Sequence, residues 1–91
     1  MLTARRFVVA GRVQGVGFRA FVYDHAWQQG ISGWVRNLPD GRVEVMAEGD
    51  AEAMQTFEIA LRRGFGRARV DDVEVDVLTP AGRATTFFIK G

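Results

Sequence analysis

The stretch Gly11-Arg12-Val13-Gln14-Gly15-Val16-Gly17-Phe18-Arg19 lies where the periodicity of the sequence changes, and it decides how the chain must fold. Residues 5–13 are rich in β-branched and apolar side chains, which predicts a strand in a central position of a sheet. Over residues 19–29 the apolar side chains recur at helical spacing, and Gly30 stands where a left-handed residue often ends a helix. The glycine-rich loop of residues 14–18 therefore leads from a strand into the N-terminus of a helix.

The sequence after Gly30 predicts four further strands and one further helix. The expected elements are strands over 31–38, 42–48, 73–77 and 85–89, and a helix from an Asp50 cap to about Arg63. Pro39-Asp40-Gly41 is a typical hairpin turn, and alternation in the strand after it places Glu44 on the solvent side. The order β-α-β-β-α-β with a last strand predicts an α+β, ferredoxin-like fold: one mostly antiparallel five-stranded sheet with two helices on one face.

Length and composition limit the classes of protein that this chain can represent. Its 91 residues fit a single domain over 1–91, and a net charge of +1 gives no broad basic field for nucleic acid. No cysteine is present, so disulfides, thiolate catalysis and cysteine-ligated metals are excluded. The apolar run of residues 7–10 is too short for a signal peptide or a membrane span. We expect a cytoplasmic monomer without a membrane or nucleic-acid partner.

The glycine loop has the composition of an anion-binding site. Gly15 and Gly17 allow a tight turn and leave the backbone open to a ligand, so that the amides of residues 14–19 can converge on a tetrahedral dianion. The helix behind the loop adds free N–H groups and the positive end of its dipole. Arg19 can grip two phosphate oxygens at once. From the residues alone, the alternative is equally open: glycines that serve only the turn, and a solvated arginine.

Two other glycine motifs fit this loop less well. The run from Gly15 to Ala20 matches a dinucleotide-binding pattern, but that pattern belongs to a doubly wound parallel sheet, and here the next strand leads into a hairpin. The ATP-binding P-loop would need Gly-Lys followed by Ser or Thr, which is missing.

The sequence resembles the acylphosphatase family in two signatures. Residues 11–19 are similar to the first signature, and Gly33-Trp34-Val35-Arg36-Asn37, continuing through residues 40–45, is similar to the second. The resemblance covers nearly the whole chain. It implies a ferredoxin-like fold and the hydrolysis of acyl phosphates such as acetyl phosphate, carbamoyl phosphate and 1,3-bisphosphoglycerate, with no metal or other cofactor. The family often differs at Arg42 and at Gly64-Phe65-Gly66.

The resemblance also assigns roles to individual positions. It implies that Arg19 binds the substrate phosphoryl group, and that Asn37 orients the attacking water. The substrate-binding positions that it implies are Gln14, Gly15, Val16, Gly17, Phe18 and Arg19, whose backbone would cradle the phosphoryl group, or inorganic phosphate in its place. Without the resemblance, an asparagine just before a turn is more simply explained as a bond to the hairpin backbone.

Three other functional hypotheses come from the same residues. Arg63-Gly64-Phe65-Gly66 matches the start of an RNA-stacking motif, but Arg67 stands where an aromatic is needed and the motif follows the second helix. A regulatory or catalytically idle ferredoxin-like domain is a second alternative, and acylphosphatase-like modules also occur within larger proteins such as hydrogenase maturation factors. The acidic residues from Asp71 to Asp76 resemble a metal-binding run, but strand alternation makes Glu74 and Asp76 a solvated face, and we expect no metal.

Overall fold

A computed structural model describes residues 1–82 and 85–91 of the chain. Its elements in chain order are β1 (Leu2–Arg12), α1 (Phe18–Gln29), β2 (Ser32–Asn37), β3 (Val43–Asp50), α2 (Ala51–Arg63), β4 (Arg69–Leu78) and β5 (Phe87–Ile89). The order of strands and helices predicted from the sequence is therefore confirmed.

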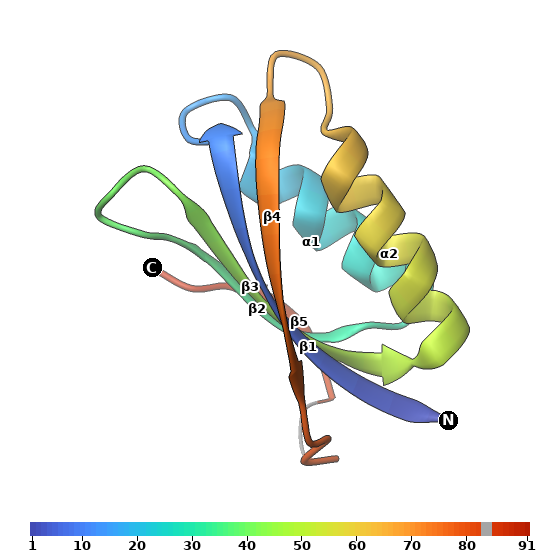
Figure 1. Ribbon diagram of the computed structural model, residues 1–91. Helices are drawn as coiled ribbons and strands as arrows, with labels where there is room; N and C mark the ends of the chain where they lie inside the picture. Colours follow the sequence, from blue (N-terminus) through green and yellow to red (C-terminus); the bar gives the residue numbers. More distant parts are fainter. Residues whose placement is uncertain (83–84) are drawn as a thin grey trace.

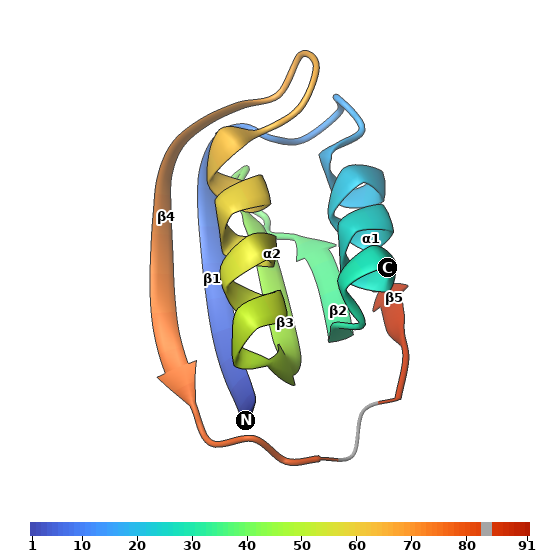
Figure 2. The ribbon, with the colours of Figure 1, turned by 90° about the vertical axis from the view of Figure 1, so that its right-hand side faces the viewer.

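The five strands form one sheet in the order β4-β1-β3-β2-β5. β1 pairs antiparallel with both β3 and β4, and β2 pairs antiparallel with β3. β5 pairs in parallel with β2, so the sheet is mixed and mostly antiparallel. Both helices lie on the same face of this sheet (Figure 1, Figure 2). The α+β ferredoxin-like prediction is confirmed, and β1 lies inside the sheet, between β4 and β3, as its apolar sequence indicates.

The core lies between the two helices and the sheet. Apolar side chains that face inward from β1, β3 and β2 meet those of both helices there. The ring of Phe57 on α2 packs edge-on against Phe7 of β1, at 6.1 Å, and against Phe87 of β5, at 6.3 Å. On α1, Val22 and Ala26 are fully buried, and Gly30 ends the helix in the left-handed conformation with a φ of 67°. The C-terminal cap predicted at Gly30 is confirmed.

The opposite face of the sheet carries a row of charges across four strands. Arg6 on β1 donates hydrogen bonds to Glu44 of β3 and to Asp76 of β4, and Arg36 on β2 donates to the other oxygen of Glu44. Glu44 lies between the two guanidiniums and is only 4% exposed. The prediction that it points to solvent is therefore wrong: alternation assigns it to the right face, but the long arginines cover it.

Burial and charge act in opposite directions on this carboxylate. Burial alone would raise the pKa of Glu44, but the hydrogen bonds from Arg36 and Arg6 outweigh that effect, and its pKa is lowered. Glu44 therefore stays ionised in the fold.

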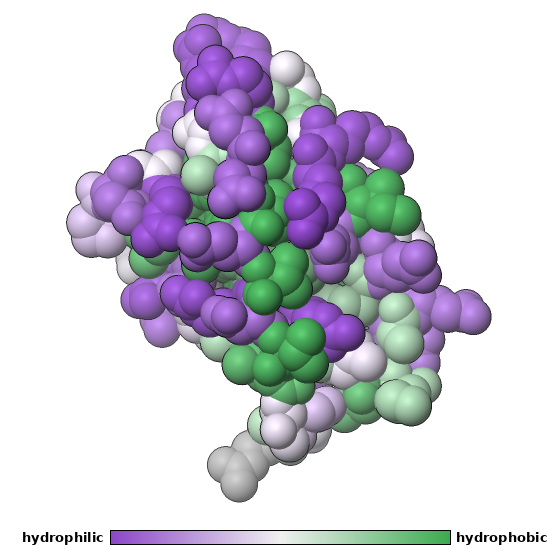
Figure 3. Space-filling model, in the orientation of Figure 1, coloured by the Kyte–Doolittle hydropathy of each residue, from purple (hydrophilic) through white to green (hydrophobic). Residues whose placement is uncertain are grey.

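Figure 3 shows hydrophilic side chains over the upper and left parts of the view, with an apolar area near the lower end of β4.

Two strands are longer than the side-chain pattern indicates. β1 begins at Leu2 because its first residues pair with the end of β3, as in the pair Leu2–Asp50. β4 begins at Arg69 because it pairs with the end of β1 at Arg12. Both extensions follow from backbone pairing, which does not require alternating side chains. Within the described residues, no helix has the length and apolar character needed to cross a membrane.

Candidate active site

The loop between β1 and α1 has a backbone that favours glycine at two positions. Gly15 has a φ of 73° and Gly17 a φ of 82°, both in the left-handed region. An added Cβ would meet nothing within 4 Å at either position, so conformation and not crowding selects glycine here. Among the residues that the structure describes, the amides of residues 14–17 have no intramolecular acceptor. The loop therefore presents a series of free N–H donors.

The N-terminus of α1, directly behind the loop, is also unsatisfied. Its N-cap is Gly17, no side chain caps the helix, and its first turn holds no acidic residue. The first N–H groups of a helix have no partner within the helix, and they carry the positive end of the helix dipole. Loop and helix together thus offer donors and partial positive charge to an anion.

A hollow of about 210 Å³ lies against this loop. The residues that line it are Val13, Gly15, Gly17, Phe18, Arg19, Ala20 and Ile89. Arg19 makes no ion pair with any of the described residues, so its guanidinium is available to a ligand. Four of the predicted site residues therefore share one cavity: Gly15, Gly17, Phe18 and Arg19.

The two remaining loop residues of the prediction are placed differently. Val16 is half-buried and packs against the apolar core. The side chain of Gln14 turns away from the hollow, and its Nε2 donates to the carbonyl oxygens of Leu38 at 2.9 Å and Arg42 at 3.0 Å. Gln14 therefore connects the loop to the β2–β3 hairpin. Figure 1 shows both segments at the same end of the molecule.

Asn37 is the last residue of β2, where it pairs with Val43 of β3. Its side-chain Oδ1 is buried and has no hydrogen-bond partner among the described residues. The hairpin is held by other groups: Leu38 N donates to Arg42 O at 2.8 Å, and the Asp40 carboxylate accepts from Arg42 N at 3.0 Å. The alternative explanation of Asn37, as a hydrogen-bond partner of the hairpin backbone, thus finds no support. A buried carbonyl oxygen without a partner is unfavourable unless water or a ligand binds it.

Two features of the site were missed by sequence reasoning. Ile89 of β5 forms part of the wall of the hollow, although it is 70 positions from Arg19, and no local motif signals this contact. The Gln14 clamp was also missed, because the motif indicates the loop backbone and not a side-chain bond to the hairpin. Alternation from the buried Phe87 to Ile89 would have placed Ile89 on the helix face, and this is the one signal available.

The other functional hypotheses fare less well against the structure. Phe65 follows α2 and not the third strand, where the RNA-stacking motif belongs, and one face of its ring stacks on Phe21 of α1, with 5.1 Å between the ring centroids. In the part of the chain that the structure describes, no three His, Cys, Asp or Glu side chains gather in a way that could hold a metal ion.

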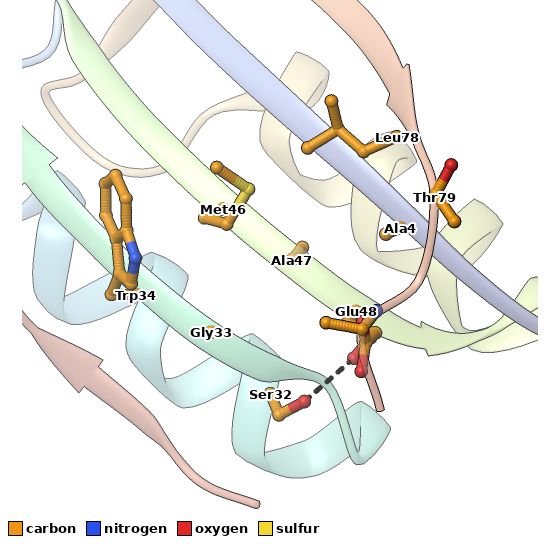
Figure 4. Close-up of a pocket in the computed structure, with 10 residues that line it drawn as sticks. Ala4, Ser32, Gly33, Trp34, Met46, Ala47, Glu48, Leu78 and Thr79 are labelled. Atoms are coloured by element: carbon orange, nitrogen blue, oxygen red, sulfur yellow. Dashed lines mark hydrogen bonds between the residues drawn. The ribbon is translucent and has the colours of Figure 1, made fainter. Parts of the chain in front are cut away.

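A second hollow, of about 240 Å³, lies on the sheet face that the helices leave open (Figure 4). Ala4, Met46 and Leu78 give it mostly apolar walls. The carboxylate of Glu48 at its edge accepts hydrogen bonds from the backbone of Ala81, at 2.6 Å, and Gly82, at 3.0 Å. This arrangement fastens the segment after β4 and offers no convergent polar groups to a substrate.

Fold and loop together define the class of protein: an α+β domain of ferredoxin-like topology whose first strand-to-helix loop is rich in glycine and leads into the N-terminus of α1. The family model for acylphosphatase matches residues 5–89. The chain therefore belongs to the acylphosphatase family.

Individual relatives agree with this assignment. An acylphosphatase from Koribacter versatilis is 48% identical over 87 residues, which cover 96% of this chain and 79% of that protein. An acylphosphatase from Pseudomonas paraeruginosa is 54% identical over 76 residues, which cover 84% of each protein. The crystal structure of acylphosphatase from Bacillus subtilis superposes with a TM-score of 0.94 at 42% identity, and the match covers 100% of both chains.

Proposed function

We propose that this enzyme hydrolyses acyl phosphates to a carboxylate and inorganic phosphate, by in-line attack of a water molecule on a phosphoryl group held in the loop of residues 14–19. The observation that carries the proposal is the set of unpartnered donors at one point: the loop amides, the uncapped N-terminus of α1 and the unpaired Arg19 around one hollow, among the described residues. Such a set matches a dianion in charge and in hydrogen bonding.

Hydrolysis of an acyl phosphate needs two things from the protein: stabilisation of negative charge and positioning of the reactants. The leaving group of an acyl phosphate is a stabilised carboxylate, so neither a nucleophilic side chain nor a strong general acid is needed. Arg19 would bind two oxygens of the phosphoryl group, and the loop amides would stabilise the charge that develops on them in the transition state. Donors that a strand–loop–helix unit holds at one place would need little reorganisation during the reaction.

Asn37 is proposed to orient the attacking water. Its buried Oδ1 lacks a partner in the described structure and can accept a hydrogen bond from water. That bond would hold the water in line with the departing carboxylate. A neutral amide is a poor base, so we assign the water's proton to a phosphate oxygen of the substrate.

The remaining parts of the proposal concern the conditions of action. We propose that residues 1–91 act as one domain, as a monomer in the cytoplasm, and without a metal or other cofactor. The product, inorganic phosphate, is expected to bind the same loop and to compete with the substrate. Size-exclusion chromatography and activity in the presence of a chelator test the monomer and the metal independence directly.

The loss of benzoyl phosphate absorbance at neutral pH, with chelator present, tests the central claim. Arg19→Ala is expected to lower kcat/KM at least about a thousandfold, because a charged donor to the phosphoryl group is lost. Arg62→Ala is the matched control, since Arg62 lies on α2 and pairs only with Glu58 among the described residues. Equal hydrolysis by wild type and Arg19→Ala would refute the proposed site, and no hydrolysis by the wild type would refute the activity.

The role of Asn37 needs a separate measurement. Asn37→Ala is expected to lower kcat about a hundredfold, while the inhibition constant of inorganic phosphate changes little, because the residue acts on the water and not on the phosphoryl group. A variant with full turnover would remove Asn37 from the mechanism.

A further inference from the structure

The loop and the hairpin are separated by a gap in the pairing of the strands that lead to them. The ladder between β1 and β3 ends at the pair Val9–Val43. Beyond Val9, β1 pairs only with β4, with a register shift after Ala10, and Gly11 approaches β4 so closely that a Cβ there would lie 2.1 Å from Arg69 O. β3 begins at Val43, so no ladder pair joins β1 to the hairpin between Val9 and the start of the loop. The backbone therefore leaves the distance between loop and hairpin open.

The side chain of Gln14 bridges this gap. Its single Nε2 atom donates one hydrogen bond to Leu38 O and one to Arg42 O, the two residues that flank the hairpin turn. Among the hydrogen bonds of the described residues, these two are the only ones between residues 13–17 and the hairpin. A side-chain amide suits this role, because its one nitrogen carries two N–H donors.

The hairpin is stiff enough to transmit this constraint to its neighbour. Leu38 N donates a hydrogen bond to Arg42 O at 2.8 Å. Arg42 Nε donates to the carboxylate of Asp40, also at 2.8 Å. Asn37 directly precedes Leu38 and forms the last rung of the β2–β3 ladder with Val43. A bond that fixes Leu38 therefore also fixes Asn37 relative to the loop.

We propose that Gln14 is a positioning residue, whose side-chain amide sets the distance between the loop that binds the phosphoryl group and the asparagine that orients the water. This inference rests on the proposed role of Asn37. A shift of about 1 Å between two reacting groups can lower a rate up to a hundredfold, so the bridge acts on turnover although it does not touch the reacting atoms. The loop amides and Arg19 do not depend on it, so phosphate binding persists without it.

The test compares Gln14→Met, which keeps the length of the side chain and removes both donors, with wild type. We expect kcat for benzoyl phosphate to fall at least about tenfold and the inhibition constant of inorganic phosphate to change less than about twofold. Gln55→Met, at an exposed position of α2, is the matched control and is expected to leave both constants unchanged. If Gln14→Met does not fold, Gln14→Asn replaces it, since its amide is one methylene too short to reach both carbonyls.

A double-mutant cycle with Asn37→Ala separates positioning from a general structural role. If Gln14 acts through Asn37, adding Gln14→Met to Asn37→Ala costs less than about twofold further in kcat. Three outcomes overturn the inference: unchanged kcat in the single variant, an equal loss of phosphate affinity, or a full tenfold loss in the Asn37→Ala background. If wild type is active and Asn37→Ala keeps full turnover, the proposed mechanism fails and the inference fails with it. Normal behaviour of Asn37→Ala alongside an inert Gln14→Met defeats the inference alone.

Discussion

The N-terminus of α2 is closed by groups of the chain itself, whereas that of α1 is left open. At α2, Asp50 accepts from Glu52 N at 3.2 Å, and Met1 O accepts from Ala51 N at 2.9 Å. At α1, Gly17 takes the capping position, and no side chain of the described residues caps the helix. Both helices pack on the same face of one sheet, and their N-termini lie at opposite ends of it (Figure 2).

The difference shows how one physical feature serves two purposes. The N-terminus of every helix has N–H groups without a partner in the helix and the positive end of the dipole, so α1 and α2 share these features. At α2 they are satisfied internally, which favours the fold. At α1 the described residues leave them without a side-chain cap, which suits the ligand site that we propose. Functional sites often break a local rule in this way, at a cost in stability. The unsatisfied end is therefore the better guide to the site than the size of a cavity.

The largest expected effect comes from replacing the guanidinium of Arg19, at the N-terminus of α1. Arg19→Lys keeps a positive charge but removes the planar fork that binds two oxygens. We expect kcat/KM for benzoyl phosphate to fall about a thousandfold, close to the loss expected for Arg19→Ala. Near wild-type kcat/KM in Arg19→Lys would show that a point charge is enough and would contradict the bidentate grip.

The second effect comes from placing a carboxylate at the N-cap position of α1. Gly17→Asp places a carboxylate beside the loop, in space that is empty around the Cβ. Its repulsion of a dianion is expected to lower kcat/KM about a hundredfold. Gly17→Asn carries the same backbone strain without the charge and is the matched control. The comparison between the two helices fails if both variants lose activity equally.

The smallest effect comes from removing the side chain that caps the N-terminus of α2. Asp50→Ala removes the cap of α2, so the midpoint of thermal unfolding should fall slightly while kcat of the folded enzyme stays unchanged. Asp72→Ala, an exposed carboxylate on β4, is the control. A marked loss of kcat at 25 °C would mean that α2 contributes to catalysis and would weaken the contrast with α1.

The same variant has a defined pH dependence. The hydrogen bond from the N-terminal ammonium lowers the pKa of Asp50 and, in return, the bond to Asp50 raises the pKa of the ammonium. A lowered carboxyl pKa stabilises the fold above the ordinary value near 4, and a raised amine pKa stabilises it below the ordinary value near 8. The difference in unfolding midpoint between wild type and Asp50→Ala should therefore be largest between about pH 5 and 8, and smaller on either side.

The fold could be predicted from local signals because those signals agree with each other. Periodicity separates β1 from α1, the turn at Pro39-Asp40-Gly41 marks a hairpin, and the caps at Gly30 and Asp50 bound the helices. The strand ends were less accessible, since β1 and β4 extend through backbone pairing that side chains do not encode. The burial of Glu44 also escaped the sequence, because it depends on two arginines from neighbouring strands.

The candidate site divides in the same way. The glycines and Arg19 lie within a few residues of one another in the chain, so a single motif indicates them together. Asn37 was indicated only by the family resemblance, because an asparagine before a turn has an ordinary local explanation. Ile89 and the bond from Gln14 to the hairpin are contacts between segments far apart in sequence. Alternation in the last strand can indicate the face on which Ile89 lies, but no spacing in a single sequence indicates which distant segment it contacts.

Within the described residues, the loop amides lack internal acceptors, and this also gives the protein a built-in reporter. Amides without a hydrogen bond exchange with deuterium quickly, and those of the β1 ladder slowly. A bound oxyanion that engages the amides of residues 14–17 would slow just these few protons and leave the sheet unaffected. Occupancy could then be followed residue by residue, in a variant too slow for any assay of turnover and without an attached label.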